Sequence, residues 1–171
     1  ITRKGSIYFT RKSKDNGRYA IWRSVFKEGS FEETTLLPNE INSDNAFDAC
    51  IAPDESYILF CSDRDGSLGG SDIYVSFYED EQWSEAVSIG SRFNTPGDET
   101  SVRITPGGKY VFYSSNGNPL NIAKAKNEPP QSASHNEIVY FTDVVNASAL
   151  LPSDSMADIY WFPARLLKSF R

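Results

Sequence analysis

Acidic side chains stand just before two of the apolar segments, where paired carboxylates could act as an acid and a base. Asp44 and Asp48 precede or begin one such segment, and Asp98 and Glu99 hold the same place before the next. Two carboxylates that face each other across a pocket can hydrolyse a glycan. The same residue types are also ordinary turn formers that hydrogen-bond to nearby backbone. We therefore take these four as candidate binding residues and assign no catalytic residue.

A second polar cluster is the run DRDG that begins at Asp63, followed by Asp72. An Asp-x-Asp-Gly run begins a calcium loop, but an EF-hand then requires Gly at its sixth position and Glu at its twelfth. Leu68 and Tyr74 occupy those two positions, so the cluster predicts neither a metal site nor a cofactor. We expect Asp63 and Asp72 to cap turns, and Arg64 to pair with a neighbouring carboxylate.

Two more polar residues complete the candidate set. His135 is the single histidine, and without a nucleophile elbow it does not indicate a catalytic triad. The glycine-rich run 66–70 lacks the Lys-Ser/Thr of a phosphate-binding loop. The candidate binding residues are Asp44, Asp48, Asp63, Arg64, Asp72, Asn94, Asp98, Glu99 and His135.

The composition limits the class of protein. A chain of 171 residues is long enough for one domain with its own core. Its net charge of −6 argues against a nucleic-acid partner, which requires a basic face. No apolar run is long enough for a membrane-spanning helix. Because there is no initiator Met and no signal peptide, we expect a processed, truncated or partial chain.

The two cysteines, Cys50 and Cys61, flank a tight turn on what are predicted to be neighbouring antiparallel strands. A cross-strand disulfide is the alternative, but ladder neighbours rarely have disulfide geometry. We expect two free, buried and inert thiols, because cysteine is among the most buried residue types.

Several features recur at a spacing of about 52 residues, and a recurring spacing indicates repeated structural units. The apolar runs 6–10, 57–61 and 110–114 are each one repeat apart. Three further matches keep the spacing: Phe31 with Trp83, residues 41–43 with 93–95, and residues 52–56 with 105–109.

Each unit is predicted to form four short antiparallel strands. Pro followed by Asp or Gly presets a tight turn, and apolar runs on both sides make that turn a hairpin. Four-stranded units of roughly 40–50 residues are typical of β-propeller blades. The predicted fold is therefore all-β, with about three blades of four antiparallel strands. The alternative is a β-sandwich made of unrelated hairpins.

With the strands of a blade named a to d from the centre outward, the chain begins after a missing strand a. We expect a single, partial propeller domain over 1–171, with units of roughly 1–46, 47–99 and 100–171. It is either part of a longer propeller or half of a six-bladed ring made by two copies, which a mass measurement in solution distinguishes. The predicted strands are 6–11, 19–26 and 33–38; 47–53, 57–62, 72–78 and 83–89; then 100–105, 109–115 and 157–163.

Residues 117–156 form an irregular insertion in the third unit. Within it, 137–145 are apolar enough for an extra strand, and Asn146 begins a glycosylation sequon. The tail 164–170 is predicted to form a short helix with Leu166, Leu167 and Phe170 on one side.

Several of these pieces, IAPDESYILF, SDRDGSLGGSDIYVS, FNTPGDET and ITPGGKYVFYSSN, resemble the PD40, or WD40-like, repeats of TolB-like β-propellers. The resemblance covers residues 6–116 and, less closely, 157–170. It implies a bacterial protein that is periplasmic or secreted. It also implies a protein-binding role, although related rings include hydrolases and lyases.

In a propeller the b-to-c and d-to-a connections emerge on one face and the other turns on the opposite face. Here the first set contains the long segments, and we expect function on this loop-rich face. The predicted function is a non-catalytic module that binds a protein or peptide. The alternative is a carbohydrate-active enzyme that uses carboxylates at the axial opening. A glycan is a second candidate ligand, and a complete chain would be expected to self-associate.

Overall fold

The computed structural model describes residues 1–14, 16–117 and 157–171 of the chain. Nearly all the regular structure in these residues is β, as predicted. The strands are β1 (Ile7–Lys12), β2 (Tyr19–Ser24), β3 (Phe26–Lys27), β4 (Ser30–Phe31), β5 (Thr35–Leu36), β6 (Phe47–Ile51), β7 (Tyr57–Ser62), β8 (Asp72–Glu79), β9 (Gln82–Trp83), β10 (Val87–Ser88), β11 (Glu99–Ile104), β12 (Tyr110–Ser115) and β13 (Asp158–Pro163). The helices are α1 (Asn39–Asn42) and the 3-10 helix η3 (Ala164–Phe170).

The strands form three main antiparallel sheets in chain order, within the part of the chain that the structure describes. The first has the order β1-β2-β5, the second β6-β7-β8-β10 with β9 also on β8, and the third β11-β12-β13. The hairpin β3-β4 forms a separate two-stranded sheet. Each sheet therefore follows the predicted order of blade strands: b, c and d in the first, a to d in the second, and a to c in the third.

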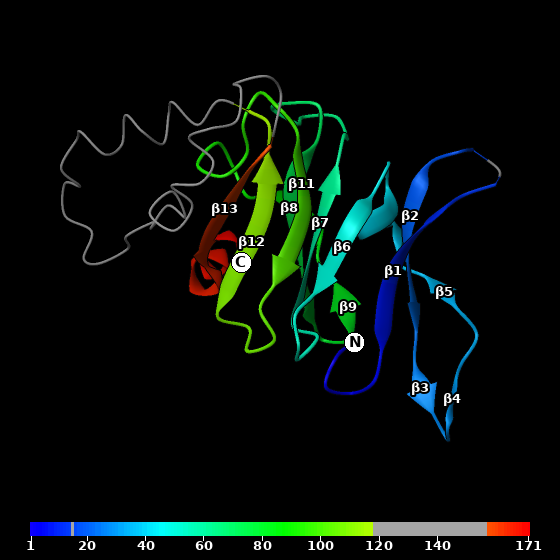
Figure 1. Ribbon diagram of the computed structural model, residues 1–171. Coiled ribbons are helices and arrows are strands. Elements are labelled where there is room, and N and C mark those ends of the chain that lie inside the picture. The colour runs from blue at the N-terminus through cyan, green and yellow to red at the C-terminus, as the bar shows by residue number, and fades with distance from the viewer. Residues whose placement is uncertain (15, 118–156) are drawn as a thin grey trace.

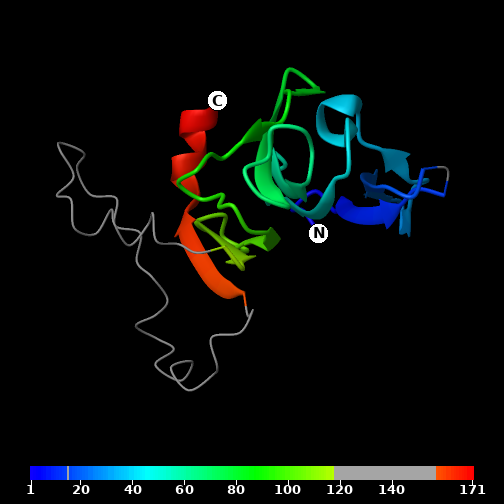
Figure 2. The ribbon, with the colours of Figure 1, turned by 90° about the horizontal axis from the view of Figure 1, so that it is seen from above.

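The three sheets lie side by side as successive blades (Figure 1), and the view from above shows the same succession (Figure 2). Strand β6, the innermost strand of the second sheet, contacts both β1 and β11. The fold is thus a partial propeller, in which neighbouring sheets pack face to face.

The second sheet is buried on both faces, which explains the unbroken apolar run of β7. Ile58 and Phe60 pack with Ile21 of the first sheet. Leu59 points the other way and packs with Val102 of the third sheet. Because side chains alternate between the faces of a strand, a strand covered on both sides is apolar at every position. The two cores on either side of β7 hold the three sheets together.

Backbone conformation repeats with the sequence. The a-to-b turns place Glu55 (φ 64°) and Gly108 (φ 70°) in the left-handed region, one repeat apart. The innermost strands β6 and β11 each contain a bulge, with Asp48 (φ 51°) and Ser101 (φ 56°) at matching positions. Since non-glycine residues rarely adopt positive φ, these matches show that the units share detailed geometry as well as strand order.

The outermost strands are shorter than predicted. The predicted strands 33–38 and 83–89 are reduced to the two-residue β5 and to the separate pieces β9 and β10. An outermost strand has a neighbour on one side only, so its ladder is easily interrupted. Single backbone bonds from Leu37 to Ile21 and from Ile89 to Ile73 continue the pairing beyond the ladders.

Two local features differ from the prediction. The predicted strand 19–26 is interrupted at Val25, where β2 ends and the hairpin β3-β4 begins. Helix α1 was not predicted in the loop 39–46. It follows Pro38, which has no amide to donate to a strand and takes an extended conformation at the N-cap of the helix (φ −69°, ψ 175°).

The C-terminal tail forms the predicted short helix. Leu167 is buried, and Leu166 and Phe170 pack beside it on the core between the second and third sheets. The predicted extra strand 137–145, the sequon at Asn146 and the candidate His135 lie outside the described residues.

Both cysteines are free. They occupy different registers of the ladder, since Cys50 lies opposite Leu59 and Cys61 opposite Phe47. Cys61 is fully buried, whereas Cys50 is only half-buried, which corrects the expectation that both are buried. Burial raises the pKa of the Cys61 thiol to about 12 and also raises that of Cys50, so both remain protonated and unreactive near neutral pH.

Candidate functional site: the loop-rich face

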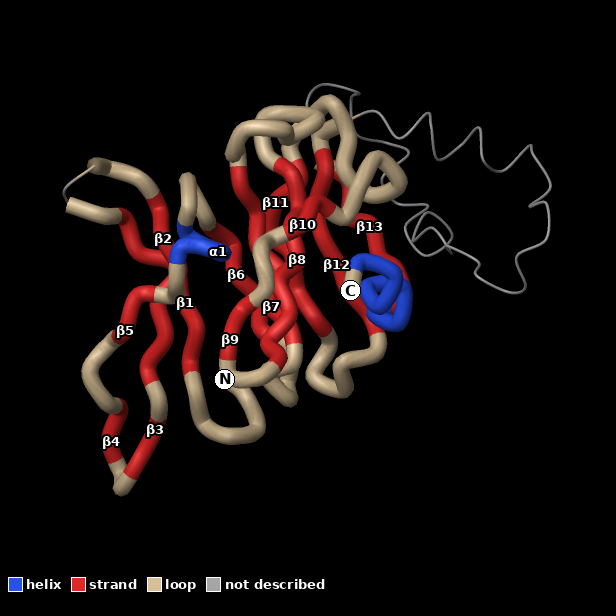
Figure 3. The backbone as a smooth tube through the Cα atoms, turned by 180° about the vertical axis from the view of Figure 1, so that it is seen from behind, coloured by secondary structure: helices blue, strands red, loops and turns tan. Residues whose placement is uncertain are grey.

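The long connections between strands gather at one end of the sheets and the short turns at the other (Figure 3). We call the end with the long connections the loop-rich face; its described segments are 13–14, 16–18, 37–46, 63–71 and 89–98. The opposite face, which we call the turn face, has the short a-to-b turns 52–56 and 105–109. All the candidate residues within the described ranges lie in or beside the loop-rich face.

Asn94 is fully buried, and its side-chain amide bonds to both the backbone N–H and the backbone C=O of a single residue, Ile73. Its Oδ1 accepts from the amide of Ile73 (2.9 Å), and its Nδ2 donates to the carbonyl of the same residue (3.0 Å). Asn42, one repeat earlier, makes the same pair of bonds to Ile21 (2.8 and 3.0 Å). The side chain thus takes the place of a neighbouring strand and fixes the d-to-a loop against strand c.

Asp72 is fully buried and caps the glycine-rich loop. Its carboxylate accepts from the amides of Leu68 (3.0 Å) and Gly69 (3.2 Å), as the capping interpretation predicted. The loop also needs its glycines, because a Cβ on Gly69 would overlap the carbonyl oxygen of Gly97 in the next d-to-a loop. Asp72 and Gly69 together hold these two loops in contact.

Arg64 is held by carbonyl, hydroxyl and aromatic groups, and it forms no ion pair among the described residues. Its Nη2 donates to the carbonyl of Ile41 (2.6 Å), and its Nε donates to Ser62 Oγ (2.9 Å). The guanidinium lies over the rings of Phe60 (4.9 Å) and Tyr74 (4.8 Å). Burial lowers the pKa of Arg64. The predicted ion pair between Arg64 and a carboxylate is therefore wrong. Arg64 instead links the second blade to the loop that follows the first blade, through its bond to Ile41.

Asn45 links two of the acidic candidates. Its Nδ2 donates to the carboxylate of Asp63 (3.1 Å), and its amide donates to that of Asp44 (2.7 Å). Asp44 also forms an ion pair with Arg18 (2.6 Å) on the neighbouring loop. Asp63 therefore bonds to another loop and does not cap its own turn.

The other two aspartates also join separate segments of the chain. Asp48 bonds to a residue one repeat later, and Asp98 bonds to a residue that follows the neighbouring strand β12. Asp48 Oδ2 accepts from the amide of Ser101 (2.7 Å), which ties together the bulges of the two innermost strands. Asp98 is bonded to Asn116, whose side chain accepts from the Asp98 amide (2.6 Å) and donates to its carboxylate (3.1 Å). Both carboxylates are thus occupied by the chain itself.

Glu99 is fully buried at the start of β11. Its carboxylate accepts from the amide of Thr95 (2.9 Å), the hydroxyl of Thr95 (2.7 Å) and the hydroxyl of Ser115 (2.6 Å). Burial raises the pKa of Glu99, and these hydrogen bonds oppose the rise. A buried carboxyl with three donors around it holds the loop 95–98 in place.

Glu55 is a buried acid that the sequence did not identify. It lies on the turn face, where it accepts from Thr2 Oγ1 (2.6 Å), Tyr8 OH (3.3 Å) and Arg23 Nη2 (3.2 Å) of the first sheet. Burial acts to raise its pKa, but the bonds from Thr2 and Ser6 and the charge of Arg23 outweigh that effect and lower it. These bonds offset the cost of its left-handed backbone.

The two buried glutamates predict opposite responses to pH. The Glu99 pKa is raised, so its carboxyl favours folding when protonated and loses this benefit as pH rises through the folded pKa. Relative to the parent, the free energy of unfolding of Glu99→Gln should therefore increase as pH rises from about 4 to 7.

The Glu55 pKa is lowered, so its stabilisation is present above about pH 4.3 and is lost as pH falls through the folded pKa. Glu55→Gln should cost about 1.5–3 kcal/mol at pH 7 and less in acid. Urea unfolding of the parent and both variants from pH 3 to 7 checks this. Parallel pH profiles for the two variants would contradict the assignment.

The described residues show no group of three or more His, Cys, Asp or Glu side chains that could hold a metal ion. Within the same ranges, no helix has the length and apolar character needed to cross a membrane. The arrangement of the described candidates is thus one of side chains that hold loops, with each carboxylate directed to a donor of the chain.

The fold is similar to that of solved proteins, whereas the sequence comparisons find no match. No family model matches the chain, and no curated protein matches its sequence. The chain is similar to the crystal structure of TolB from Acinetobacter baumannii, with 21% identity and a TM-score of 0.41. The match covers 65% of this chain and 24% of the TolB chain, so the chain corresponds to about a quarter of that protein's length. Membership of the PD40 family stays a prediction.

Proposed function

We propose that this chain is a non-catalytic binding module that holds a protein or peptide on its loop-rich face. The observation that supports the proposal is that polar side chains of this face fix its loops: Asp72 and Glu99 bond to loop backbone, and Asn94 bonds its loop to the backbone of β8. Loops fixed in this way lose little conformational entropy when a partner binds. A preformed surface of this kind favours recognition over chemistry.

The same loops leave apolar side chains in solvent. Leu68, in the glycine-rich loop, is 51% exposed, and Tyr19, at the start of β2, is 43% exposed. The Tyr19 ring packs against Phe47 (6.3 Å between ring centroids), which holds it in one orientation. Exposed aromatic and aliphatic side chains on rigid supports are typical anchors of protein interfaces. We propose these two as the anchors of the site.

The carbohydrate-active alternative gains no support from the described carboxylates. It requires two carboxylates free to face a sugar, one to donate a proton and one to attack or to activate water. Asp48 and Glu99 instead accept from Ser101, Thr95 and Ser115. We therefore carry the binding proposal forward, with residues 1–171 as one partial propeller domain. In line with the PD40 resemblance, we place it in the bacterial periplasm or outside the cell.

A binding experiment with a changed anchor tests the proposal. The immobilised chain is exposed to a bacterial envelope extract, each retained protein is identified and purified, and its affinity is measured by titration. Leu68→Asp should lower the affinity at least about tenfold, because burying a new charge at an interface core opposes binding. The free energy of unfolding should be unchanged, since the Leu68 side chain is exposed.

Leu36→Asp is the matched control. Leu36 is 52% exposed, nearly the same as Leu68, but lies on the outermost strand β5 away from the loop-rich face. Equal losses in both variants would contradict the loop-rich face as the site. Binding on a glycan array that is unaffected by Leu68→Asp would favour the carbohydrate alternative.

A further inference from the structure

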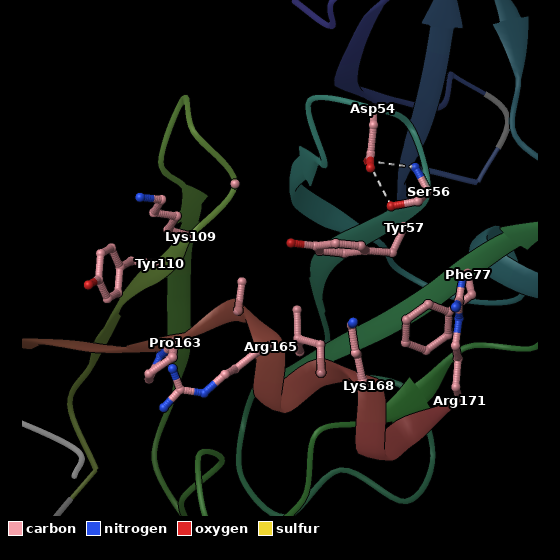
Figure 4. Close-up of a pocket in the computed structure, with 13 residues that line it drawn as sticks. Asp54, Ser56, Tyr57, Phe77, Lys109, Tyr110, Pro163, Arg165, Lys168 and Arg171 are labelled. Atoms are coloured by element: carbon pink, nitrogen blue, oxygen red, sulfur yellow. Dashed lines mark hydrogen bonds between the residues drawn. The ribbon is translucent and has the colours of Figure 1, made fainter. Parts of the chain in front are cut away.

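Basic side chains surround a cavity on the turn face, between the second and third sheets (Figure 4). The cavity has a volume of about 460 Å³. Four of its thirteen lining residues are basic and one is acidic. The basic ones are Lys109, Arg165, Lys168 and Arg171, and the acidic one is Asp54. The chain as a whole has a net charge of −6, so the sign of the charge around this cavity is opposite to that of the chain.

The 3-10 helix explains why the basic residues gather. A 3-10 helix has three residues per turn, so side chains three apart lie on the same side. Arg165, Lys168 and Arg171 follow this spacing and border the cavity, while Ala164 and Leu167 follow it on the buried side. The tail is therefore an amphipathic helix with a basic edge along the cavity.

The two lysines of the cavity are uncompensated by any acidic partner among the described residues. Among the described residues Lys109 and Lys168 form no ion pair, and Arg171 pairs with Glu79 (2.7 Å) at the rim. The Asp54 carboxylate is occupied by the amide (3.1 Å) and hydroxyl (2.7 Å) of Ser56, and these bonds lower its pKa. The cavity thus presents an excess of positive charge to a ligand.

Aromatic rings line the same cavity. Tyr57 and Phe77 pack together (6.2 Å between ring centroids), and Arg171 lies over the Phe77 ring (5.4 Å). Tyr110 on β12 also lines the cavity and is 42% exposed. An apolar surface bordered by cations suits a ligand that carries both negative charge and apolar groups.

The basic surface continues beyond this cavity. A second cavity of about 130 Å³ is lined by Arg3 and shares Asp54, Tyr57 and Gly108 with the first. Because the two cavities share these residues, they form one track along the a-to-b turns with basic side chains lining both parts. A compact anion would fill only part of such a track, whereas an extended chain could follow all of it.

We propose that this track binds an acidic peptide segment of a partner protein, whose carboxylates pair with the lysines and arginines while an apolar side chain rests on Tyr57 and Tyr110. The track is on the turn face, so it is a second site, separate from the anchors proposed on the loop-rich face. Its charge would make the association dependent on salt.

The test uses a fluorescein-labelled peptide of twelve residues that contains Glu, Gly and Tyr, with a Gln-for-Glu version beside it. Lys109→Glu/Lys168→Glu should weaken binding of the acidic peptide at least about tenfold, and the Gln version should bind poorly to the parent. Both lysines are exposed, so thermal unfolding should match the parent. Raising the salt from 50 to 500 mM should weaken binding to the parent.

Lys14→Glu/Arg92→Glu is the matched control, since it makes the same change in net charge on the loop-rich face. It should leave the affinity for the peptide within about twofold. Leu68→Asp should also leave it unchanged, which separates this site from the proposed function. Equal weakening by the control, displacement of the peptide by an equal concentration of inorganic phosphate, or failure of the parent to bind would each overturn the proposal.

Discussion

Phe60→Ala should lower the free energy of unfolding by about 3–5 kcal/mol. Phe60 is fully buried on β7 and stacks on Tyr74 (6.1 Å between ring centroids). Its ring also supports the guanidinium of Arg64 at 4.9 Å, which in turn bonds to Ile41 at the end of the first sheet. Truncation therefore leaves a cavity in the core between two blades and removes a support of Arg64, which links them.

Urea unfolding at pH 7 measures this loss. Phe26→Ala is the control, because Phe26 is 47% exposed in the hairpin β3-β4 and borders no blade interface. It should cost no more than about 1 kcal/mol. A loss below about 1.5 kcal/mol for Phe60→Ala would mean that the first and second sheets do not pack through this ring.

Asn94→Ala should cost about 2–4 kcal/mol, because it strands buried backbone groups that cannot reach water. Asn94 donates to Ser88 (2.9 Å) as well as binding both polar groups of Ile73. Asn42→Ala should cost a similar amount, since Asn42 bonds in the same way to Ile21 and to the carbonyl of Leu37 (2.8 Å).

The same denaturation experiment measures both variants. Asn16→Ala provides the control, because Asn16 is exposed and accepts one bond from the amide of Arg18 (3.0 Å) within its own loop. Its cost should be below about 1 kcal/mol. If Asn94→Ala and Asn42→Ala lower the free energy of unfolding by amounts that differ by more than about 2 kcal/mol, the two asparagines do not have equivalent roles in their units.

The strands and turns of the blades could be predicted from the sequence, because the signals that specify them are local. The Pro-Asp and Pro-Gly turns, the alternation within strands and the unbroken apolar run of β7 each act over a few residues. Their spacing of about 52 residues located strands in all three sheets, whereas β13 follows the long insertion and was located by the match of its Asp-Ile-Tyr run to that of β8. The repeat of Asn42 at Asn94 was also visible, although the pattern alone did not show that the amides bond to strand c.

The remaining features depend on partners far apart in the chain. Glu55 meets Thr2, Tyr8 and Arg23 only once the first sheet packs against the second. The partners of Arg64 could not be chosen from sequence, because both carboxylates and aromatic rings were close in the chain. The basic edge had a signal in the sequence, the three-residue spacing of Arg165, Lys168 and Arg171. That spacing places the three side chains on one side only if the tail forms a 3-10 helix, which the sequence did not predict.

The central claim is that carboxylates on the loop-rich face hold its loops in one shape. Amide hydrogen exchange by NMR tests it most directly at Leu68, Gly69 and Thr95, whose amides donate to Asp72 and Glu99. The structure predicts that these three amides exchange slowly, much as the strand amides do. Exchange at the rate of an unfolded chain would show that the carboxylates do not hold the loops and would contradict the account.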